Sequence, residues 1–408
     1  MKRTFLLAVS ALLLSASCSG QRGLIGSRTP LAVRMVESEI ARHPSAASLD
    51  GIAPGKIKWN YTTGLELLSM IDAGDTYGRS DFYDYALRYY DSIVRPDASV
   101  ITYKKEKYNL DHICPGRPLF IIAERTGEAR YVQVLDTLFC QLEEHPRNDD
   151  GGFWHKLAYP HQMWLDGLYM AEPFYAEYAV RKMGESELFP NLKADIVCQF
   201  TTVADHTYDP VTGLYRHACD VSREMFWCDK ITGQTPHAWG RAMGWYAMAI
   251  VETLQYLGVD ETTQPMVDIL NHIYKVLPKF ADPETGMWYQ VLDQPGREGN
   301  YLEATGSIMF VYAMLKGVRL GYLPADLKPE AMRLYERFVE RFVRENEDGT
   351  ISITDCCAVA GLGGKDMRDG SFEYYISEPI IENDCKGVGP FIWASMEYDA
   401  ARGRLSLD

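Results

Sequence analysis

Four short polar turns, spaced regularly between apolar helical segments, constrain the fold of this chain more than any other feature. Each turn begins with aspartate or asparagine and contains a glycine shortly before an aromatic or β-branched residue; the turns cover residues 148–154, 209–215, 282–288 and 346–351. These residue types favour tight loops and the entries to β-hairpins. The turns recur at about sixty to seventy residues, the length of two helices with their connections. A series of repeating helical hairpins is therefore predicted.

Apolar residues between the turns follow one another at three- and four-residue steps, the spacing of helices with a buried face. Helices are predicted over residues 59–72, 82–93, 130–143, 165–183, 192–204, 242–257, 262–280, 306–320, 330–343 and 390–401. Helical hairpins that repeat around a ring form an (α/α)6 barrel. We therefore predict an all-α fold, an (α/α)6 barrel of helical hairpins with short β-hairpin loops. On periodicity alone, an irregular helical domain remains an equal alternative.

The first residues have the pattern of a signal peptide. Lys2 and Arg3 precede an apolar run that ends at Leu14 and is too short to span a membrane. The residues after it resemble a lipoprotein cleavage box, in which Cys18 becomes the acylated first residue. Ser15 stands where leucine is usual, so ordinary secretion is the alternative. The protein is expected to be exported, either periplasmic or anchored to the membrane by a lipid at Cys18.

Length and composition complete the domain assignment. With 408 residues, 47% of them hydrophobic, the chain can bury one large core. We expect a signal peptide over residues 1–18, a flexible lead over 19–35 and a single catalytic domain over 36–408. The net charge of −15 argues against nucleic acid as a partner. No C-x-x-C pair or other spacing of metal ligands is visible, so neither a metal nor a cofactor is expected.

The densest group of chemically useful residues covers positions 154–170. His155 and Lys156 precede Trp164, Asp166 and Tyr169, so that an acid between two aromatic residues opens an apolar helix. Such an acid can serve as a proton donor in a shielded site. Asp166 could instead cap the helix by accepting amide hydrogens at its first turn.

A second group lies at another loop-to-helix junction, over residues 237–246. Trp239 and Trp245 flank Arg241, and such a set can stack on the apolar face of a pyranose while the guanidinium pairs with a carboxylate. The same residues could simply pack helix ends together. Other polar and aromatic segments that open or precede helices are 58–61, 108–113 and 215–217. Loops at one end of a barrel would bring all of these segments to a single rim.

Four motifs in order make a resemblance specific. WLDGLYM (164–170), HAWGRAMGWY (237–246), NYLEATGSIMF (300–310) and SEPIIENDCKGVGPF (377–391) resemble the unsaturated rhamnogalacturonyl hydrolases of glycoside hydrolase family 105. These are relatives of the unsaturated glucuronyl hydrolases of family 88. The match runs from about residue 59 to 398. It implies an (α/α)6 barrel and an unsaturated oligosaccharide as the substrate.

The resemblance also implies roles for individual residues. Asp166 falls on the family's general acid/base, and Asp111 on its second active-site carboxylate. The family's substrate-binding positions fall on Tyr61, His155, Lys156, His217, Trp239, Arg241 and Trp245. Where relatives commonly read R-G-N-G-W, this chain has Ala242 and Met243 after Arg241, a departure that affects the details of the subsite.

The implied reaction removes a 4,5-unsaturated galacturonyl residue from the non-reducing end of a rhamnogalacturonan oligosaccharide. Asp166 would protonate C4 of the enol ether, and water would add at C5. Three alternatives stay open: a glucuronyl hydrolase acting on glycosaminoglycan fragments, a non-catalytic glycan-binding lipoprotein, and a sugar epimerase. The last would use histidines as bases, drawn from His112, His155, His161, His217 and His237.

Overall fold

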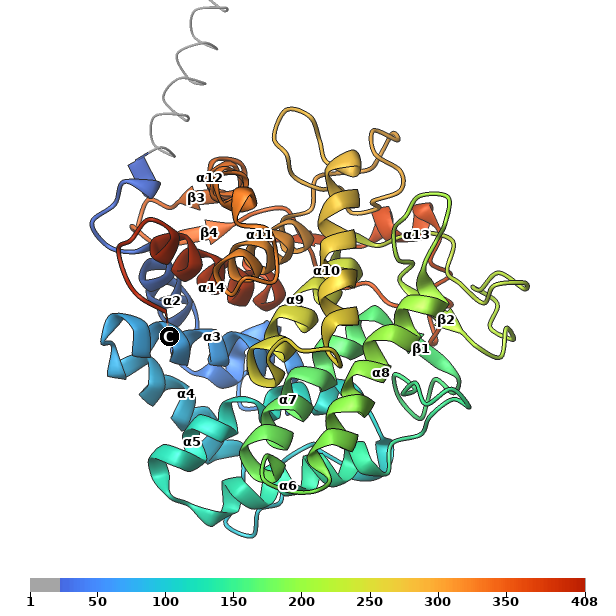
Figure 1. The fold of residues 1–408 in the computed structure, drawn as a ribbon. Coiled ribbons are helices and arrows are strands. Elements are labelled where there is room, and N and C mark those ends of the chain that lie inside the picture. Colours follow the sequence, from blue (N-terminus) through green and yellow to red (C-terminus); the bar gives the residue numbers. More distant parts are fainter. Residues whose placement is uncertain (1–22, 408) are drawn as a thin grey trace, which may run out of the picture.

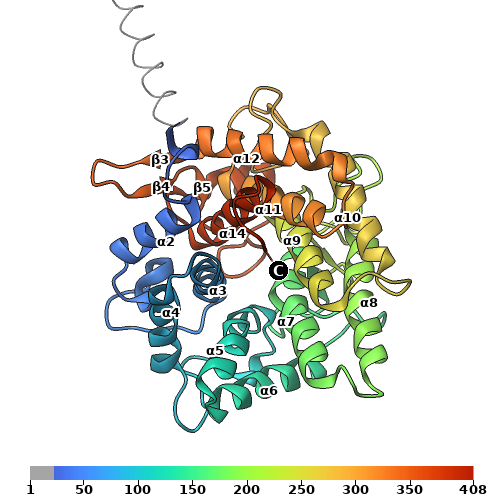
Figure 2. The same cartoon turned by 60° about the vertical axis from the view of Figure 1, so that its left-hand side comes forward.

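The computed structural model describes residues 23–407, and the predicted signal peptide with Cys18 lies outside the described residues. The main helices form two concentric rings (Figures 1 and 2). The inner ring contains α3 (Tyr61–Tyr77), α5 (Pro118–Thr126), α7 (Leu165–Met183), α9 (Gly240–Leu257), α11 (Ala304–Arg319) and α14 (Cys385–Ala401). The outer ring contains α2 (Leu31–Arg42), α4 (Ser80–Ile93), α6 (Ala129–Glu143), α8 (Phe189–Thr207), α10 (Gln264–Val276) and α12 (Lys328–Phe342). The predicted (α/α)6 barrel is confirmed.

The two rings differ in how their helices are buried. On the inner helix α11 every residue from Ala304 to Gly317 is buried, whereas the outer helix α12 buries only one stripe, which includes Leu334, Phe338 and Phe342. A helix that is apolar all round belongs in an interior, and one with a single apolar stripe belongs at a surface. The ring closes where α14 packs between α11 and α3, so the two ends of the domain meet (Figure 2).

All four predicted turns form tight antiparallel connections from an outer helix to the next inner helix. Arg147 pairs with Phe153, Tyr208 with Tyr215 and Ala281 with Trp288. The fourth turn joins β3 (Val343–Glu345) to β4 (Ile351–Ile353). The other short strands are β1 (Gln162–Trp164) paired with β2 (Ala218–Asp220), and β5 (Cys356–Cys357) paired with β6 (Ile380–Ile381); a short helix, α13, covers Phe372–Ser377.

Two helices and two boundaries differ from the prediction. Helix α5 was not predicted, because it is short and begins directly at Pro118. Helix α2 was not predicted either, and it begins inside the stretch 19–35 that was assigned to a flexible lead. That boundary was wrong: Leu31, Val33 and Met35 are buried against the barrel. Helix α14 begins before Pro390, where the prediction started it, because the proline is accommodated inside the helix.

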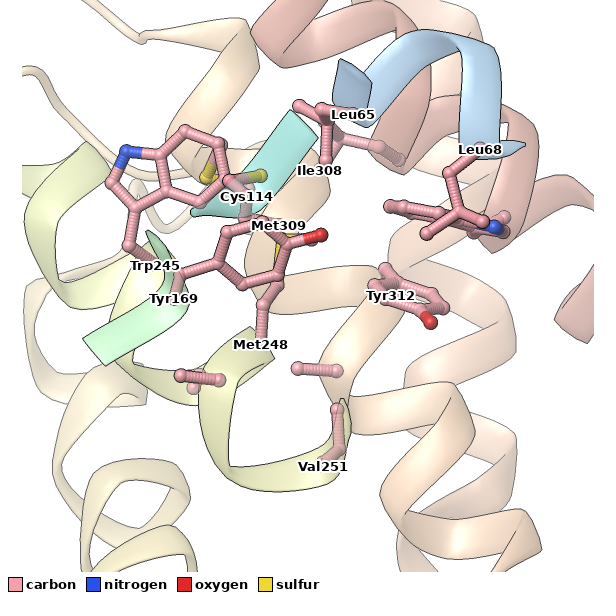
Figure 3. Close-up of a cluster of buried hydrophobic side chains, with 14 of the residues drawn as sticks. Leu65, Leu68, Cys114, Tyr169, Trp245, Met248, Val251, Ile308, Met309 and Tyr312 are labelled. Atoms are coloured by element: carbon pink, nitrogen blue, oxygen red, sulfur yellow. The ribbon is translucent and has the colours of Figure 1, made fainter. Parts of the chain in front are cut away.

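Side chains from the inner helices fill the barrel axis (Figure 3). In the C-terminal halves of α9 and α11, Glu252 and Lys316 lie 2.7 Å apart, and Arg117, which directly precedes α5, lies 2.7 Å from Glu252; all three are buried. This ionic cluster borders a cavity of about 510 Å³ at that end of the barrel. At the opposite end, the N-terminal ends of the inner helices carry the residues that the sequence analysis singled out.

Candidate active site

The predicted site residues converge on one end of the barrel, as the loop-to-helix positions of their motifs indicated. Tyr61 and Asp166 lie in the first turns of α3 and α7, and Arg241 lies in the first turn of α9. Asp111 lies in a short 3₁₀ turn, Leu110–His112, which precedes α5. His155, Lys156 and His217 come from the loops that lead into β1 and β2.

The pairing of β1 with β2 places His217 beside Asp166. Trp164 is opposite Ala218 in this pair, and the Leu165 amide donates to the His217 carbonyl oxygen at 3.1 Å. The Nε2 atom of His217 then lies 3.2 Å from Oδ2 of Asp166. Within residues 23–407, neither atom has a partner at full hydrogen-bond geometry. The N-cap of α7 is Trp164, and Asp166 forms no capping bond, so the carboxyl remains available for chemistry.

A second pairing of loops surrounds Asp111 with basic groups. The Leu110 amide donates to the His155 carbonyl oxygen at 3.2 Å. This pairing brings Nε2 of His155 to 3.3 Å from Oδ1 of Asp111 and Nζ of Lys156 to 3.4 Å from Oδ2. Burial by itself would raise the pKa of Asp111, but the charge of Lys156, together with the imidazole of His155, outweighs it and holds the pKa well below its usual range. Asp111 is therefore an ionised carboxylate.

Gly167 explains why glycine follows the acid in the WLDGLYM motif. A Cβ atom at this position would lie 3.1 Å from Nδ1 of His155 and 3.1 Å from the Leu110 side chain. The absence of a side chain lets the loop that carries His155 lie directly against α7. The loop that places His155 beside Asp111 therefore packs against the first turn of α7, which carries Asp166.

The tryptophan and arginine cluster forms the interior wall of the site, not an open platform. Trp239, Arg241 and Trp245 are only 1–2% exposed. Nη2 of Arg241 lies 3.3 Å from Glu303 and also donates to the Cys357 carbonyl oxygen. The alternative interpretation, that these residues pack helix ends together, therefore accounts for much of the geometry of this cluster. The Nε and Nη1 atoms of Arg241 have no hydrogen-bond partner in the described structure.

Three residues that support the site were missed in the sequence. The Tyr375 hydroxyl lies 2.7 Å from Nδ1 of His217. Gln290 accepts from the indole N–H of Trp239 at 3.0 Å. Glu303 pairs with Arg241 and accepts from the Gly306 amide as the N-cap of α11. Only Glu303 lay in a quoted motif, and the other two come from segments without any distinctive pattern.

Exposure separates the groups that an incoming molecule can reach from those that support them. The side chains of Asp111 and Lys156 are about a fifth exposed, and that of Asp166 is 14% exposed. His217 is completely buried. A solvent-borne ligand therefore meets the two carboxylates and the lysine first.

Three further observations concern the described residues alone. Among them, no group of three or more histidine, cysteine, aspartate or glutamate side chains is arranged to hold a metal ion. In the same part of the chain, none of the helices has the length and apolar character needed to cross a membrane. The eight cysteines of this region are free thiols, six of them buried.

A ring of helical hairpins with two carboxylates, a lysine and two histidines at one end defines a carbohydrate-active enzyme of the (α/α)6-barrel class. The sequence profile of Glycosyl Hydrolase Family 88 matches residues 31–401. The chain belongs to this family and is a glycoside hydrolase.

Individual relatives agree with this assignment. A family 105 glycoside hydrolase from Clostridium acetobutylicum ATCC 824 is 42% identical; the similarity covers 91% of this chain and all of that one, with a TM-score of 0.85. Protein Atu3128 of Agrobacterium fabrum is 36% identical over 56% of this chain and 97% of its own length. The unsaturated rhamnogalacturonyl hydrolase YesR of Bacillus subtilis is 27% identical over 52% of this chain and 59% of its own length.

Proposed function

We propose that the protein is an unsaturated rhamnogalacturonyl hydrolase. It would remove a 4,5-unsaturated galacturonyl residue from the non-reducing end of rhamnogalacturonan oligosaccharides. The observation that carries the proposal is the pair of carboxylates at one barrel end, Asp166 beside His217 and Asp111 beside Lys156. Similarity to a family 105 enzyme over nearly the whole chain, and to YesR over about half of it, supports the choice of substrate.

The two carboxylates have different roles in the proposed reaction. Asp166 donates a proton to C4 of the enol ether, which leaves an oxocarbenium-like cation at C5. Water adds at C5 and returns a proton to Asp166. The resulting hemiketal opens to a 5-ketone, and the hemiacetal at C1 then expels the rest of the oligosaccharide as an alcohol. Asp111, held as an anion, stabilises the positive charge that develops at C5.

The basic groups serve the substrate carboxylate. Solvent reaches the Lys156 ammonium, and Arg241 presents its Nε and Nη1 donors from the interior, both without a partner among residues 23–407. In a chain with a net charge of −15, positive charge gathered at this one end gives an acidic sugar a local site. His217 would orient Asp166 from within the wall.

Isotopes distinguish hydration from ordinary glycoside hydrolysis. The purified mature protein is incubated with the unsaturated disaccharide left by a rhamnogalacturonan lyase, and loss of the C4=C5 absorbance is followed. In H₂¹⁸O the label should enter at C5, and in D₂O one deuterium should appear at C4. Label at C1, with C4 unlabelled, would show direct hydrolysis at the anomeric carbon and refute the mechanism.

Variants and a second substrate test the assignment of residues and of substrate class. Asp166→Asn should lower kcat by at least about 10²-fold, the usual contribution of a positioned acid. Asp149→Asn, in a turn outside the site, is the matched control and should keep full activity. An unsaturated disaccharide from chondroitin should be a poorer substrate by kcat/KM. Preference for it would favour the glucuronyl hydrolase alternative, and binding without turnover of either would favour a glycan-binding protein.

We also propose that the protein is exported and carries a lipid at Cys18. The support is the sequence of residues 2–18 alone. Cells that express the full chain should place it in the membrane fraction, and Cys18→Ala should release it. A protein that remains soluble with its cysteine intact would indicate ordinary secretion.

A further inference from the structure

A small enclosed space lies behind His155, on the side away from Asp111. It has a volume of about 10 Å³, and all of its lining residues are buried, among them His155, Leu168, Glu172 and Gln199. A volume of this size corresponds to about one water molecule. The lining combines apolar side chains with polar groups from α7, α8 and the His155 loop.

Two buried polar atoms on this lining lack partners in the described structure: Nδ1 of His155 and Oε2 of Glu172. His155 is 3% exposed and Glu172 is 1% exposed, so bulk water does not reach either side chain. Leaving such groups without hydrogen bonds is unfavourable, because neither water nor the protein replaces the lost hydrogen bonds. The third polar group, Gln199, already donates from Nε2 to Gly151 and Asp195, and its Oε1 accepts from the Phe153 amide. One lone pair of that oxygen remains for a further donor.

We propose that this space holds one water molecule between Glu172 and His155, and that Glu172 is thereby a positioning residue that keeps the His155 proton on Nε2. The inference rests on the proposed function, because it gives His155 a task in orienting Asp111. Glu172 donates to the water, and the water donates to Nδ1 of His155 and to Oε1 of Gln199. Nε2–H of His155 then faces Asp111, 3.3 Å away. Each group in this chain uses the donors and acceptors that it possesses.

The charges around Glu172 agree with this direction of donation. Burial, and after it the charge of Asp195, raise the pKa of Glu172 well above its usual range, although Arg147 opposes them. Glu172 is therefore a neutral carboxylic acid with one O–H to donate. Which imidazole nitrogen carries the proton depends on the hydrogen bond that the other nitrogen makes. A neutral His155 also avoids a second positive charge beside Lys156.

Nitrogen NMR of the imidazole rings tests the proposal without substrate. In protein labelled with ¹⁵N-histidine, His155 should show a protonated Nε2 and a hydrogen-bonded, unprotonated Nδ1 near neutral pH. Glu172→Gln keeps a donor of the same size and should keep this pattern. Glu172→Leu removes the donor, so both tautomers should appear and kcat/KM should fall by about tenfold, as is usual when a supporting hydrogen bond is lost. Circular dichroism and the unfolding midpoint would establish that both variants are folded.

Each outcome decides the proposal. A wild-type His155 that is an imidazolium, or that carries its proton on Nδ1, overturns it, and so does a Glu172→Leu variant with an unchanged spectrum and unchanged activity. Failure of the proposed function has a different signature: no unsaturated disaccharide would be consumed by the wild type, while the Nε2–H tautomer and its loss in Glu172→Leu would still be observed.

Discussion

Replacing Glu252 with glutamine should destabilise the barrel by about 3–5 kcal/mol at pH 7. The Glu252 carboxylate accepts from Arg117 and Lys316 at 2.7 Å each, and also from the Tyr312 hydroxyl. Burial would raise its pKa, but the charges of Lys316 and Arg117 outweigh burial and lower it from 4.5 to about 2. At 1.36 kcal/mol per unit, this difference corresponds to about 3 kcal/mol of stability. Glutamine keeps the shape and leaves two buried cations without an anion.

The pH dependence gives a second, independent check of this argument. A carboxylate whose pKa is lowered by folding contributes its stability above the unfolded value, and the contribution is lost as pH falls from about 4.5 toward 2. The difference in the free energy of unfolding between wild type and Glu252→Gln should therefore become smaller as pH falls over that range. Urea unfolding followed by tryptophan fluorescence at pH 7 and pH 4 measures it. Glu330→Gln, which breaks an exposed pair with Arg333, is the control and should change stability by less than about 1 kcal/mol.

A loss below about 1 kcal/mol, equal to that of the control, would refute the reasoning. A difference in the free energy of unfolding that stays constant with pH would also refute the reasoning, because the charge of Glu252 would then not be what stabilises the fold. Replacing Glu252, Arg117 and Lys316 together by apolar residues of similar size should recover most of the loss, since no buried charge is then left unpaired.

Three further expectations concern other parts of the barrel. Asp72→Asn should stabilise the protein by about 3 kcal/mol at pH 8 and by almost nothing near pH 4, because burial raises the pKa of Asp72 to about 6 and ionisation costs stability only above its unfolded value of 3.8. Urea titrations at both pH values would show the difference. Gly64→Ala should cost about 2–3 kcal/mol in the same assay, because its Cβ would lie 2.4 Å from the Cα of Pro115 and backbone must move. Arg241→Lys should raise KM for the unsaturated disaccharide at least tenfold with little loss of stability. Lysine keeps the charge beside Glu303 but cannot present the Nε and Nη1 donors of the guanidinium. An unchanged KM would exclude contact between Arg241 and the substrate.

The barrel was predictable because its signals are local and repeated. Polar turns with glycine, and helices with three- and four-residue apolar steps, each report on their own segment. These patterns left an irregular helical domain as an equal alternative, and the four motifs shared with family 105 favoured the ring. Helix α5 escaped prediction because nine residues hold too few apolar steps for a period to show. Helix α2 was missed because its apolar residues follow a stretch rich in glycine and serine.

The site was predictable only in part, for a physical reason. Asp166 and Arg241 open helices inside distinctive motifs, so their places at the barrel end followed from the chain alone. Tyr375 and Gln290 act through contacts with residues far away in the sequence, His217 and Trp239, and nothing near them marks that role. The burial of Trp239 and Trp245 also depends on Tyr375 and on the inner helices, and the motif by itself suggested an open stacking surface.

The closure of the inner ring by α14 has a consequence for how the chain is made. Helix α14 contains the seventeen residues Cys385–Ala401, and its partners α3 and α11 each bury nearly all of their surface in the finished barrel. During synthesis, α3 lacks its neighbour α14 until more than three hundred further residues have been added. Its apolar face stays exposed to other nascent chains throughout that time. We therefore expect the inner ring to close only after α14 has been synthesised, because α14 supplies the contacts between α11 and α3.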